Sequence, residues 1–504
     1  MTPRAEALVL APTWLEARAL RLGAPSTSVR RTGMGQRGAR GAAEGLRHEP
    51  VDGLAVAGFC GALDGALRPG DVVVASELRT ADGSVTIECP GAGVIAGMLR
   101  RRGLQTHVGP IVSVKRPATG KTRRTLGESG AIAADMESAW LGQAAAGRPL
   151  IVVRTVLDTP SRELWNPLAT ATGVVRATRA LHEAAAALGE WAAALGPRDL
   201  VLAAPRASCA GVERAIEVVE KALERFGPPI YLRKEIVHNR HVVAELERRG
   251  ATCVQELAEV PDGATVVFSA HGVSPQVREE ARRRQLNVID ATCPLVSKVH
   301  AEARRFAQSG HTIVLVGHEN HEEVEGTTGE APDHIRVIAE EDEVDGLRVE
   351  DPSRVAYLTQ TTLAVDETEG VVSRLRQRFP EVVGPRSDDI CYATQNRQDA
   401  VKALASSAEL VLVVGSRNSS NSNRLVEVAE RNGCKARLVD DETQIDPRWL
   451  AGVRRIGITA GASSPERVVQ HVVGALRVLG PLEVREHAVA DETVRFALPR
   501  EVRG

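Results

Sequence analysis

The sequence has no long hydrophobic run and no surplus of charge, and each absence removes a class of protein. No apolar run approaches the roughly 20 residues needed to cross a bilayer. The start soon reaches Glu16 and Arg18, which predicts a strand and a helix rather than a signal peptide. We therefore expect a cytoplasmic location without a membrane span. The net charge of -2 leaves no basic excess to neutralise phosphates, which argues against nucleic-acid binding.

Two short motifs are also missing. The cysteines stand singly and no CxxC pair occurs, which excludes a zinc ribbon and a compact ferredoxin-type cluster motif. Disulfides are not expected in a reducing compartment, so metal binding or catalysis is the better use for any special cysteine. The absence of GxxxxGK[ST] argues against a Walker-type nucleotide site.

The length and composition indicate a soluble protein of at least two domains. A chain of 504 residues, 43% hydrophobic and 25% charged, is typical of globular proteins but exceeds the roughly 250–300 residues that one core supports. Short apolar runs alternate with amphipathic helical stretches, which predicts an α/β fold with mostly parallel sheets. An Ala-rich helical pattern ends at Gly196-Pro197, where a helix cannot continue. We predict a first domain at 1–195, a second at 198–485 and a C-terminal tail at 486–504.

Three cysteines of the second domain share one context. Cys209, Cys293 and Cys391 each follow an extended segment and precede a helical pattern. Ligands of open α/β sheets bind beyond the carboxyl ends of the strands, and helix N-termini favour thiolates. Three converging thiolates suit zinc or an iron–sulfur cluster. The arrangement predicts three small α/β lobes around a common centre, at about 198–292, 293–389 and 390–485.

Polar side chains occupy other strand-to-helix junctions of the same domain. A lone serine or asparagine at such a place is most often an N-cap, but here hydroxyls, amides and helix N-termini gather without a basic surplus. That combination is typical of a site that wraps a small phosphorylated ligand, and histidines add charge-assisted donors. The residues are His238, His241, His271, His318, His321, Glu323, Thr361, Thr362, Ser419, Ser420, Asn421, Asn423, Ser463 and Ser464.

A series of ordered motifs between about residues 199 and 480 carries a resemblance to a known family. The motifs are PRxxCAGVxRAI, EIVHN, FSAHGVSP, DATCPLVxKVH, GHxxHxEVEGTxGEAP, TQTTLxVDET, DDICYATQNRQ, GSxNSSNSNRL and TAGASSPE. This part of the chain resembles the 4-hydroxy-3-methylbut-2-enyl diphosphate reductases, the LytB-type enzymes of the last step of the methylerythritol phosphate route to isoprenoids. The resemblance implies reductive removal of a hydroxyl to give isopentenyl diphosphate and dimethylallyl diphosphate.

The resemblance also implies a role for each site residue. A [4Fe–4S] cluster, one per chain, would be held by Cys209, Cys293 and Cys391, which leaves an open position on the fourth iron. Glu323 would supply the proton for the departing water, and Thr361 would organise the substrate hydroxyl. Electrons would come from a ferredoxin- or flavodoxin-type donor with NADPH upstream. The allylic diphosphate substrate would be bound by His238, His271, His321, Thr362, Ser419, Ser420, Asn421 and Ser463.

One position departs from the family pattern. The family usually has Gly-Phe before the first cysteine, where this chain has Ala207-Ser208. The loss of the glycine is expected to change the backbone beside the cluster, and the loss of the aromatic ring to loosen its shielding. The alternative for this domain is a non-catalytic iron–sulfur or zinc protein that acts as a sensor or electron carrier.

The first domain carries weaker motifs in a fixed order: APTWLEARAL, RTGMGQRGAR, VAGFCGALDGALRPGDVVVA, IAADMESAWLGQAA and LIVVRTVLDT. They resemble the purine nucleoside phosphorylase and methylthioadenosine nucleosidase superfamily, including its hopanoid-associated phosphorylases. The resemblance implies a purine nucleoside substrate whose departing base Asp158 would protonate, while Glu16 positions a water. Glu137 would bind the ribose hydroxyls, and Met136 would pack against the sugar.

Two further points concern the chemistry of the first domain. Gly33 and Gly35 would let the backbone approach phosphate or ribose. Glu16 and Glu137 could instead be ordinary helix charges, and no arginine-based phosphate motif stands out, so the sequence does not separate phosphorolysis from hydrolysis. The alternative to an enzyme is a degenerate nucleoside-binding module.

Overall fold

The computed structural model describes residues 6–164 and 167–503, and its internal contacts divide the chain into two units. Unit 1 comprises Met1–Leu200, Asp441–Arg455 and Gln470–Val484, and unit 2 comprises Val201–Asp440, Ile456–Val469 and Arg485–Gly504. Both units have the α/β fold that the sequence predicts. No helix in the described ranges is long and apolar enough to cross a membrane.

Unit 1 is built on one eight-stranded sheet with the order β2-β1-β3-β7-β6-β4-β5, in which β8 pairs with both β3 and β4. The pairings among β3, β7, β6, β4 and β8 close a ring of strands. The strands are β1 (Ala7–Ala11), β2 (Ser28–Arg31), β3 (Gly53–Ala62), β4 (Val72–Thr80), β5 (Thr86–Glu88), β6 (Thr106–Ser113), β7 (Ala133–Asp135) and β8 (Leu150–Asp158). The α-helices are α1 (Trp14–Gly23), α2 (Gly35–Leu46), α3 (Ala92–Arg101), α4 (Gly120–Glu128), α5 (Ser138–Gly142) and α6 (Pro167–Ala193).

The burial of these strands follows their composition. β3 and β8 are apolar along most of their length and almost wholly buried, as expected of strands that are covered on both faces. β2 lies at the edge of the sheet, has the sequence Ser-Val-Arg-Arg and is largely exposed. Its charged side chains suit this position, because they protect an edge strand from pairing with another chain.

Two late segments of the chain belong to unit 1 although the sequence assigns them to the second domain. The Nε1 atom of Trp191, at the end of α6, donates to the carbonyl of Val478 at 2.9 Å. The guanidinium of Arg198 donates to the carbonyl of Leu479 at 3.2 Å. Because buried groups bond across the expected boundary, the predicted limits of 1–195 and 198–485 do not coincide with the two units.

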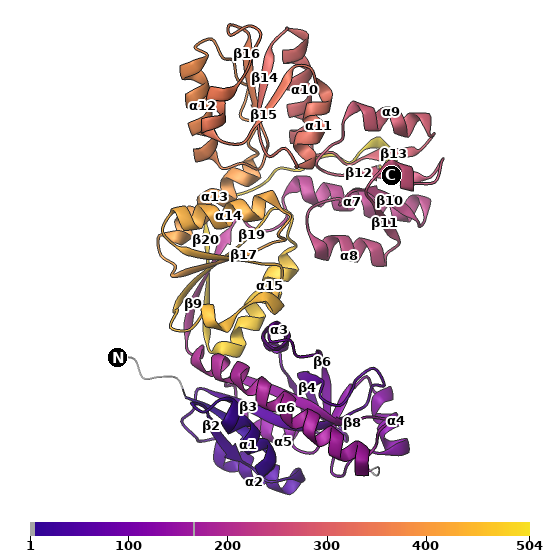
Figure 1. Cartoon of the computed structure of the whole chain (residues 1–504), viewed down its shortest axis with the longest axis vertical. Helices are drawn as coiled ribbons and strands as arrows, with labels where there is room; N and C mark the ends of the chain where they lie inside the picture. Colours follow the sequence, from indigo (N-terminus) through magenta and orange to yellow (C-terminus); the bar gives the residue numbers. More distant parts are fainter. Residues whose placement is uncertain (1–5, 165–166, 504) are drawn as a thin grey trace. The chain divides into compact units, whose positions relative to one another are not determined.

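The rest of the chain forms three sheets, each with its own helices (Figure 1). Their strand orders are β11-β10-β12-β13 in the first lobe, β15-β14-β16 in the second and β18-β17-β19-β9-β20 in the third. The strands are β9 (Arg198–Ala204), β10 (Ile230–Arg233), β11 (Ala251–Val254), β12 (Thr265–Phe268), β13 (Asn287–Asp290), β14 (Thr312–Val316), β15 (Ile335–Ile338), β16 (Val355–Thr359), β17 (Leu410–Val414), β18 (Lys435–Val439), β19 (Arg455–Ala460) and β20 (Leu482–Ala488). The α-helices are α7 (Ala210–Phe226), α8 (Arg240–Arg248), α9 (Pro275–Arg283), α10 (Pro294–Gln308), α11 (Glu322–Glu330), α12 (Val365–Arg378), α13 (Tyr392–Ala405), α14 (Ser420–Arg431) and α15 (Glu466–Leu476).

The second lobe shows how its central strand is covered on both faces. Successive side chains of a strand point to opposite faces. Ile313 and Leu315 of β14 therefore join one apolar cluster, which includes residues of α10, while Val314 and Val316 join another with Leu375 of α12. Because both faces of this parallel strand are covered, its sequence is a continuous apolar run.

Each of the three cysteines lies where the chain passes from one lobe to the next. β9 belongs to the third sheet, but α7, which follows Cys209, packs in the core of the first lobe. Cys293 stands between β13 of the first lobe and α10 of the second, and Cys391 precedes α13 of the third. The structure thus places 198–204 in the third lobe, not in the predicted first lobe (198–292), because its hydrogen-bonding partners are β19 and β20.

The predicted tail at 486–504 is also part of the folded structure. β20 extends to Ala488, and Glu492 accepts a hydrogen bond from buried Arg397 of α13 at 2.9 Å. Val502 is buried in the core of the first lobe. The last segment therefore runs from the third sheet to the first lobe and contributes to both.

Candidate functional site

The three cysteines line one cavity in unit 2. Each is the N-cap residue of its helix. A Cβ atom added to Gly211 would lie 2.8 Å from Cys293 Sγ and 3.8 Å from Cys209 Sγ, so a glycine is needed between the two sulfurs. The Sγ atom of Cys391 lies 3.0 Å from Thr394 Oγ1 and accepts a hydrogen bond from the Thr394 backbone N–H at 3.3 Å.

Burial determines the protonation of two of these thiols. It raises the pKa of Cys293 to about 12 and that of Cys391 to about 11, and the neighbouring cysteine sulfurs add to both shifts. Desolvation therefore outweighs the expected preference for thiolate at a helix N-terminus. Three neighbouring sulfurs that would repel one another as thiolates are a donor set that a positively charged iron or zinc centre stabilises.

Glu323 and Thr361 lie in the wall of the same cavity. Glu323 is 2% exposed, and its Oε1 and Oε2 atoms accept hydrogen bonds from Thr361 N at 2.7 Å and Thr361 Oγ1 at 3.0 Å. Burial raises the pKa of Glu323 to about 7 although both hydrogen bonds lower it. A carboxyl group that is partly protonated near neutral pH can deliver a proton to a ligand in the cavity.

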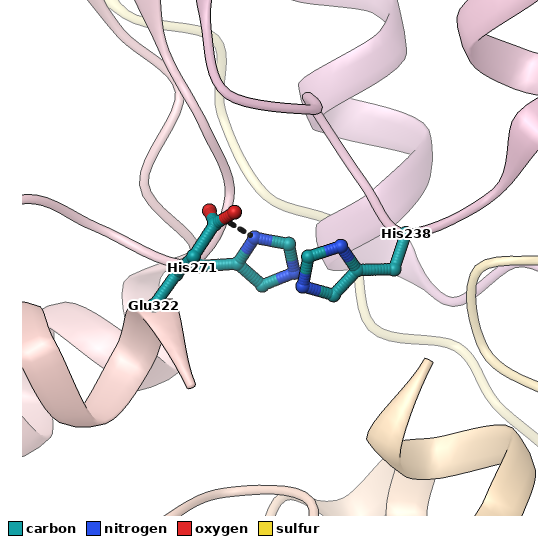
Figure 2. A group of neighbouring side chains, drawn as sticks. All are labelled: His238, His271 and Glu322. Carbon is teal, nitrogen blue, oxygen red and sulfur yellow. Dashed lines mark hydrogen bonds and ion pairs between the residues drawn. The ribbon is translucent and has the colours of Figure 1, made fainter. Parts of the chain in front are cut away.

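Three histidine rings gather at the polar end of the cavity. The rings of His238 and His271 are stacked, with centroids 4.1 Å apart, and His321 lies edge-on to both at 5.6 and 5.7 Å. Figure 2 shows the stacked pair with Glu322, whose Oε2 atom lies 3.2 Å from His271 Nδ1. Glu235 Oε2 lies at the same distance from His238 Nδ1. Two of the three histidines are therefore each backed by a carboxylate.

Hydroxyl and amide groups complete this end of the cavity. Thr362 Oγ1 donates to Ser420 Oγ at 3.2 Å, and Ser463 Oγ donates to the carbonyl of His238 at 3.1 Å. Ser419 is the N-cap of α14, as His321 is of α11. The two helix N-termini place partial positive charge beside the histidines.

All the site residues that the resemblance assigns to the second domain line this one cavity. Four other polar residues of the strand-to-helix junctions do not. The cavity is lined by Cys209, Cys293, Cys391, His238, His271, His321, Glu323, Thr361, Thr362, Ser419, Ser420, Asn421 and Ser463. The described lining does not include His241, His318, Asn423 and Ser464.

The backbone at Ala207 has the conformation that a glycine favours. Its φ angle is 60°, in the left-handed region where a Cβ atom costs about 1–2 kcal/mol. Its carbonyl accepts hydrogen bonds from Arg397 Nη2 at 2.7 Å and Nε at 3.1 Å. Ser208 Oγ donates to the carbonyl of Ser464 at 3.2 Å. The turn before Cys209 is thus retained without the glycine, since buried hydrogen bonds hold it.

Sequence reasoning missed several residues of this cavity. Gly211 and Thr394 stand within the motifs CAGV and CYAT, and their closeness in sequence to Cys209 and Cys391 could have identified them as residues of the site. Phe496 also lines the cavity, but nothing in the sequence pattern of the tail indicates this. Glu235 and Glu322 likewise stand beside the predicted histidines, and their pairing depends on ring orientations that a sequence does not reveal.

A second cavity lies in unit 1 and is lined by Glu16, Met136, Glu137 and Asp158. Glu16 is 2% exposed and accepts hydrogen bonds from Phe59 N at 2.7 Å and from the hydroxyl of Thr13, its N-cap partner, at 2.6 Å. Glu137 accepts from Gly35 N at 2.7 Å, and burial raises its pKa to about 7. Neither carboxylate is an ordinary surface charge.

The sequence did not predict two buried arginines of this unit. Arg123 is 3% exposed, lines the cavity and forms an ion pair with Asp158. Burial raises the pKa of Asp158 although the Arg123 guanidinium opposes the shift. Arg154 is fully buried and lies 2.8 Å from Asp135 and 3.6 Å from Glu137. Gly33 and Gly35 have φ angles of 84° and 74°, the left-handed conformation that glycine permits.

Two family models match the chain in the same order as its two cavities. Residues 20–189 match the model described as Phosphorylase superfamily, and residues 200–477 match the model described as LytB protein.

Proteins of known name match the second part of the chain over most of their length. The 4-hydroxy-3-methylbut-2-enyl diphosphate reductase of Nocardia farcinica is 61% identical over 305 residues, which are 60% of this chain and 91% of the relative. The enzyme of the same name from an Azoarcus strain is 56% identical over 304 residues, 60% of this chain and 97% of the relative. The solved E-1-hydroxy-2-methyl-but-2-enyl-4-diphosphate reductase of Plasmodium falciparum is 38% identical, with a TM-score of 0.59 over 61% of this chain and 97% of that one.

Proposed function

The chain belongs to the LytB protein family, and from this membership we propose that its second part reduces 4-hydroxy-3-methylbut-2-enyl diphosphate to isopentenyl diphosphate and dimethylallyl diphosphate. The observation that carries the proposal is one cavity with three cysteine sulfurs, a buried carboxyl group of pKa about 7 and a cluster of histidines and hydroxyls. This arrangement can hold a small ligand that has a diphosphate at one end and a reducible carbon–oxygen bond at the other.

A [4Fe–4S] cluster fits the donor set of this cavity. Cys209, Cys293 and Cys391 would hold it, and its positive iron ions would offset the repulsion among three neighbouring thiolates. The missing side chain of Gly211 leaves the space beside two of the sulfurs. When bound, the cluster supplies the electrons for reduction of the substrate. Those electrons would come from a ferredoxin- or flavodoxin-type partner with NADPH upstream.

Glu323 and Thr361 supply the protein's part of the chemistry. Replacing a carbon–hydroxyl bond by a carbon–hydrogen bond consumes two electrons and two protons and releases one water. Protonated Glu323 donates one of these protons to the departing hydroxyl. Thr361, whose hydroxyl is hydrogen-bonded to Glu323, orients the departing hydroxyl. The apolar side chains of Val212, Val237 and Leu295 also line the cavity and would limit the access of bulk water to a bound substrate.

The test of this function is an anaerobic assay of the purified chain with the allylic diphosphate and a chemical reductant, together with iron and sulfide analysis. We expect about four irons and about four sulfides per chain, as a cubane cluster requires, and formation of both diphosphate products. Zinc without sulfide, or a cluster without any turnover, would instead favour the sensor or electron-carrier alternative.

For unit 1 we propose cleavage of the glycosidic bond of a purine nucleoside. Support comes from its match to the phosphorylase superfamily and from the cavity that joins Asp158 with Glu16, Met136 and Glu137. Asp158 would protonate the departing base, Glu137 would bind the ribose hydroxyls, and Glu16 would position the attacking water or anion.

Purine release from a panel of nucleosides, with and without phosphate, tests this second activity. We expect Asp158→Asn to lower the rate at least about 100-fold, the usual contribution of a general acid, while the exposed Asp64→Asn control keeps it. If the unaltered chain releases no base from any nucleoside of the panel, the domain is a binding module.

A further inference from the structure

The polar end of the reductase cavity lacks the side chains that usually neutralise a diphosphate. Among the described residues that line the cavity there is no lysine and no arginine. The positive charge for an anion must therefore come from the helix N-termini and from the histidines, whose charge depends on protonation.

The hydrogen bonds of His238 and His271 fix which ring nitrogen carries a proton. An ionised carboxylate can only accept, so Nδ1 of each ring donates to its partner, Glu235 or Glu322. The hydrogen bond from His238 keeps the pKa of Glu235 below its usual range. Burial raises the pKa of Glu322, but the hydrogen bond from His271 and the nearby positive charges together outweigh burial, and the pKa is lowered. In the neutral rings, Nε2 is therefore a bare acceptor that repels phosphate oxygen.

His321 has the opposite arrangement. Its Nδ1 atom accepts a hydrogen bond from the backbone N–H of Glu323 at 3.1 Å, so the proton of the neutral ring is on Nε2. Burial and the adjacent histidines lower the pKa of His321 to about 3. His321 can thus donate to a phosphate oxygen as a neutral ring, which the other two histidines cannot.

We propose that this site takes up protons together with its diphosphate, one at Nε2 of His238 and one at Nε2 of His271, and that Glu235 and Glu322 are the positioning residues that make this possible. The inference rests on the proposed reductase function. Each carboxylate holds its ring through Nδ1–H and stabilises the imidazolium, while the new Nε2–H donates to the diphosphate. The bound ligand then meets two charged donors and one neutral donor.

The charged groups around the pair agree with this assignment. Besides Glu235 and Glu322, the titratable groups beside the two rings are each other and His321, which lies edge-on to both. Lys234 acts on the carboxylate of Glu322. Lys234 is itself paired with Glu325 at 2.6 Å. Burial lowers the pKa of His271, so that ring is neutral before the anion arrives. The diphosphate is therefore the new charge that favours protonation.

The same residues could be considered as a cation site, since ligand atoms of His238, His271 and Glu322 lie within 4.8 Å of one another. The geometry favours the anion. Glu322 lies against Nδ1 of His271, on the opposite side of the ring from Nε2 (Figure 2). If a cation bound both Nε2 atoms, the ring of His271 would separate it from Glu322, which therefore could not be one of the cation's ligands.

Calorimetric titration of the cluster-loaded chain with isopentenyl diphosphate tests the inference. Binding heats measured at about pH 7.5 in two buffers of different ionisation enthalpy give the number of protons taken up. Free histidine and the ligand's terminal phosphate are then both mostly deprotonated, with pKa values of about 6.5 and about 6. We expect about two protons per bound ligand, because each neutral imidazole takes up one.

Matched variants separate this role from a structural one. Glu322→Gln should reduce the uptake to about one proton and weaken binding about tenfold, the equivalent of one pKa unit at one histidine. Glu235→Gln should do the same at His238, whereas Glu319→Gln, an exposed glutamate of the same segment, should change neither quantity.

The possible failures are distinguishable. Binding without proton uptake overturns this inference and leaves the reductase function standing. Absence of binding to the loaded chain overturns the proposed site and this inference with it. If binding requires added Zn²⁺ and takes up no proton, the histidines are cation ligands and the inference is wrong.

Discussion

At the scale of single residues, burial decides what Glu323 can do. An exposed glutamate is ionised at neutral pH, but Glu323 is 2% exposed and its pKa is raised to about 7. Its hydrogen bonds to Thr361 favour the ionised form and desolvation opposes them. The balance leaves a group that can release and regain a proton during turnover.

The protonation of Glu323 predicts a pH dependence of the reaction. If Glu323 is the proton donor that we propose, its acid form is needed, so turnover by the loaded enzyme should be highest below about pH 7 and fall as pH rises through the pKa. Glu323→Gln should keep the cluster spectrum but lower kcat by at least about 100-fold, the usual loss for a general acid. Glu319→Gln is the control. Unchanged kcat in Glu323→Gln would remove this residue from the proton path.

Ala207 carries a backbone cost that a glycine would not. Because its φ angle is 60°, Ala207→Gly should raise the free energy of unfolding by about 1 kcal/mol. Ala403→Gly, in the last turn of α13, should instead lower it, by no more than about 1 kcal/mol. Denaturant unfolding of the two variants measures both changes. A loss of stability in Ala207→Gly would mean that the left-handed turn is not strained.

At the scale of elements, the crossings between lobes explain why the cysteines meet. Each cysteine caps a helix that starts a new lobe, and the helices α7, α10 and α13 therefore begin near one another. The sequence predicts the order of strand, cysteine and helix at each crossing. It does not reveal that 198–204 pairs with β19, which lies about half the chain away, because strand pairing depends on partners that no local pattern identifies.

Helix α13 holds the turn before the first cysteine through one ion pair. Arg397 is fully buried, bonds to the Ala207 carbonyl and pairs with Glu492 at 2.9 Å. Glu492→Gln should leave the guanidinium without its counter-charge and lower the free energy of unfolding by about 3 kcal/mol.

Denaturant unfolding measures this change, with exposed Asp491→Asn as the control. The electron paramagnetic resonance spectrum of the reduced cluster adds a local measurement, since a displaced Ala207 should alter the surroundings of Cys209. Equal stability of Glu492→Gln and Asp491→Asn would show that the pair makes no net contribution.

At the scale of the whole molecule, sequence and structure agree on two α/β parts, and the predicted site residues of the second part line one cavity. They differ where function depends on distant segments. Phe496 and Glu492 belong to a segment that the sequence predicts as a tail, because its pattern shows neither a strand nor an apolar helix face. Arg123 was missed because an isolated arginine in a helical pattern gives no sign that it turns inward to Asp158.

The burial of Val502 predicts that the end of the chain stabilises the first lobe. Val502 is 4% exposed within that core, whereas Val494 is 42% exposed. Val502→Ala should lower the free energy of unfolding by about 2 kcal/mol, since a small cavity remains, and Val494→Ala should change it by less than about 0.5 kcal/mol. Thermal unfolding of both variants measures the difference, and equal values would exclude the anchoring role.

The position of Val502 also has a consequence for the order in which the protein matures. The ribosome makes the strands of the first lobe long before it makes the segment that completes their core, and Phe496, which lines the cavity of the three cysteines, is made equally late. Until Phe496 has been made, the cavity of the three sulfurs lacks this part of its wall. If the cavity holds the cluster that we propose, iron and sulfide have open access to the sulfurs on that side until Phe496 and Val502 dock.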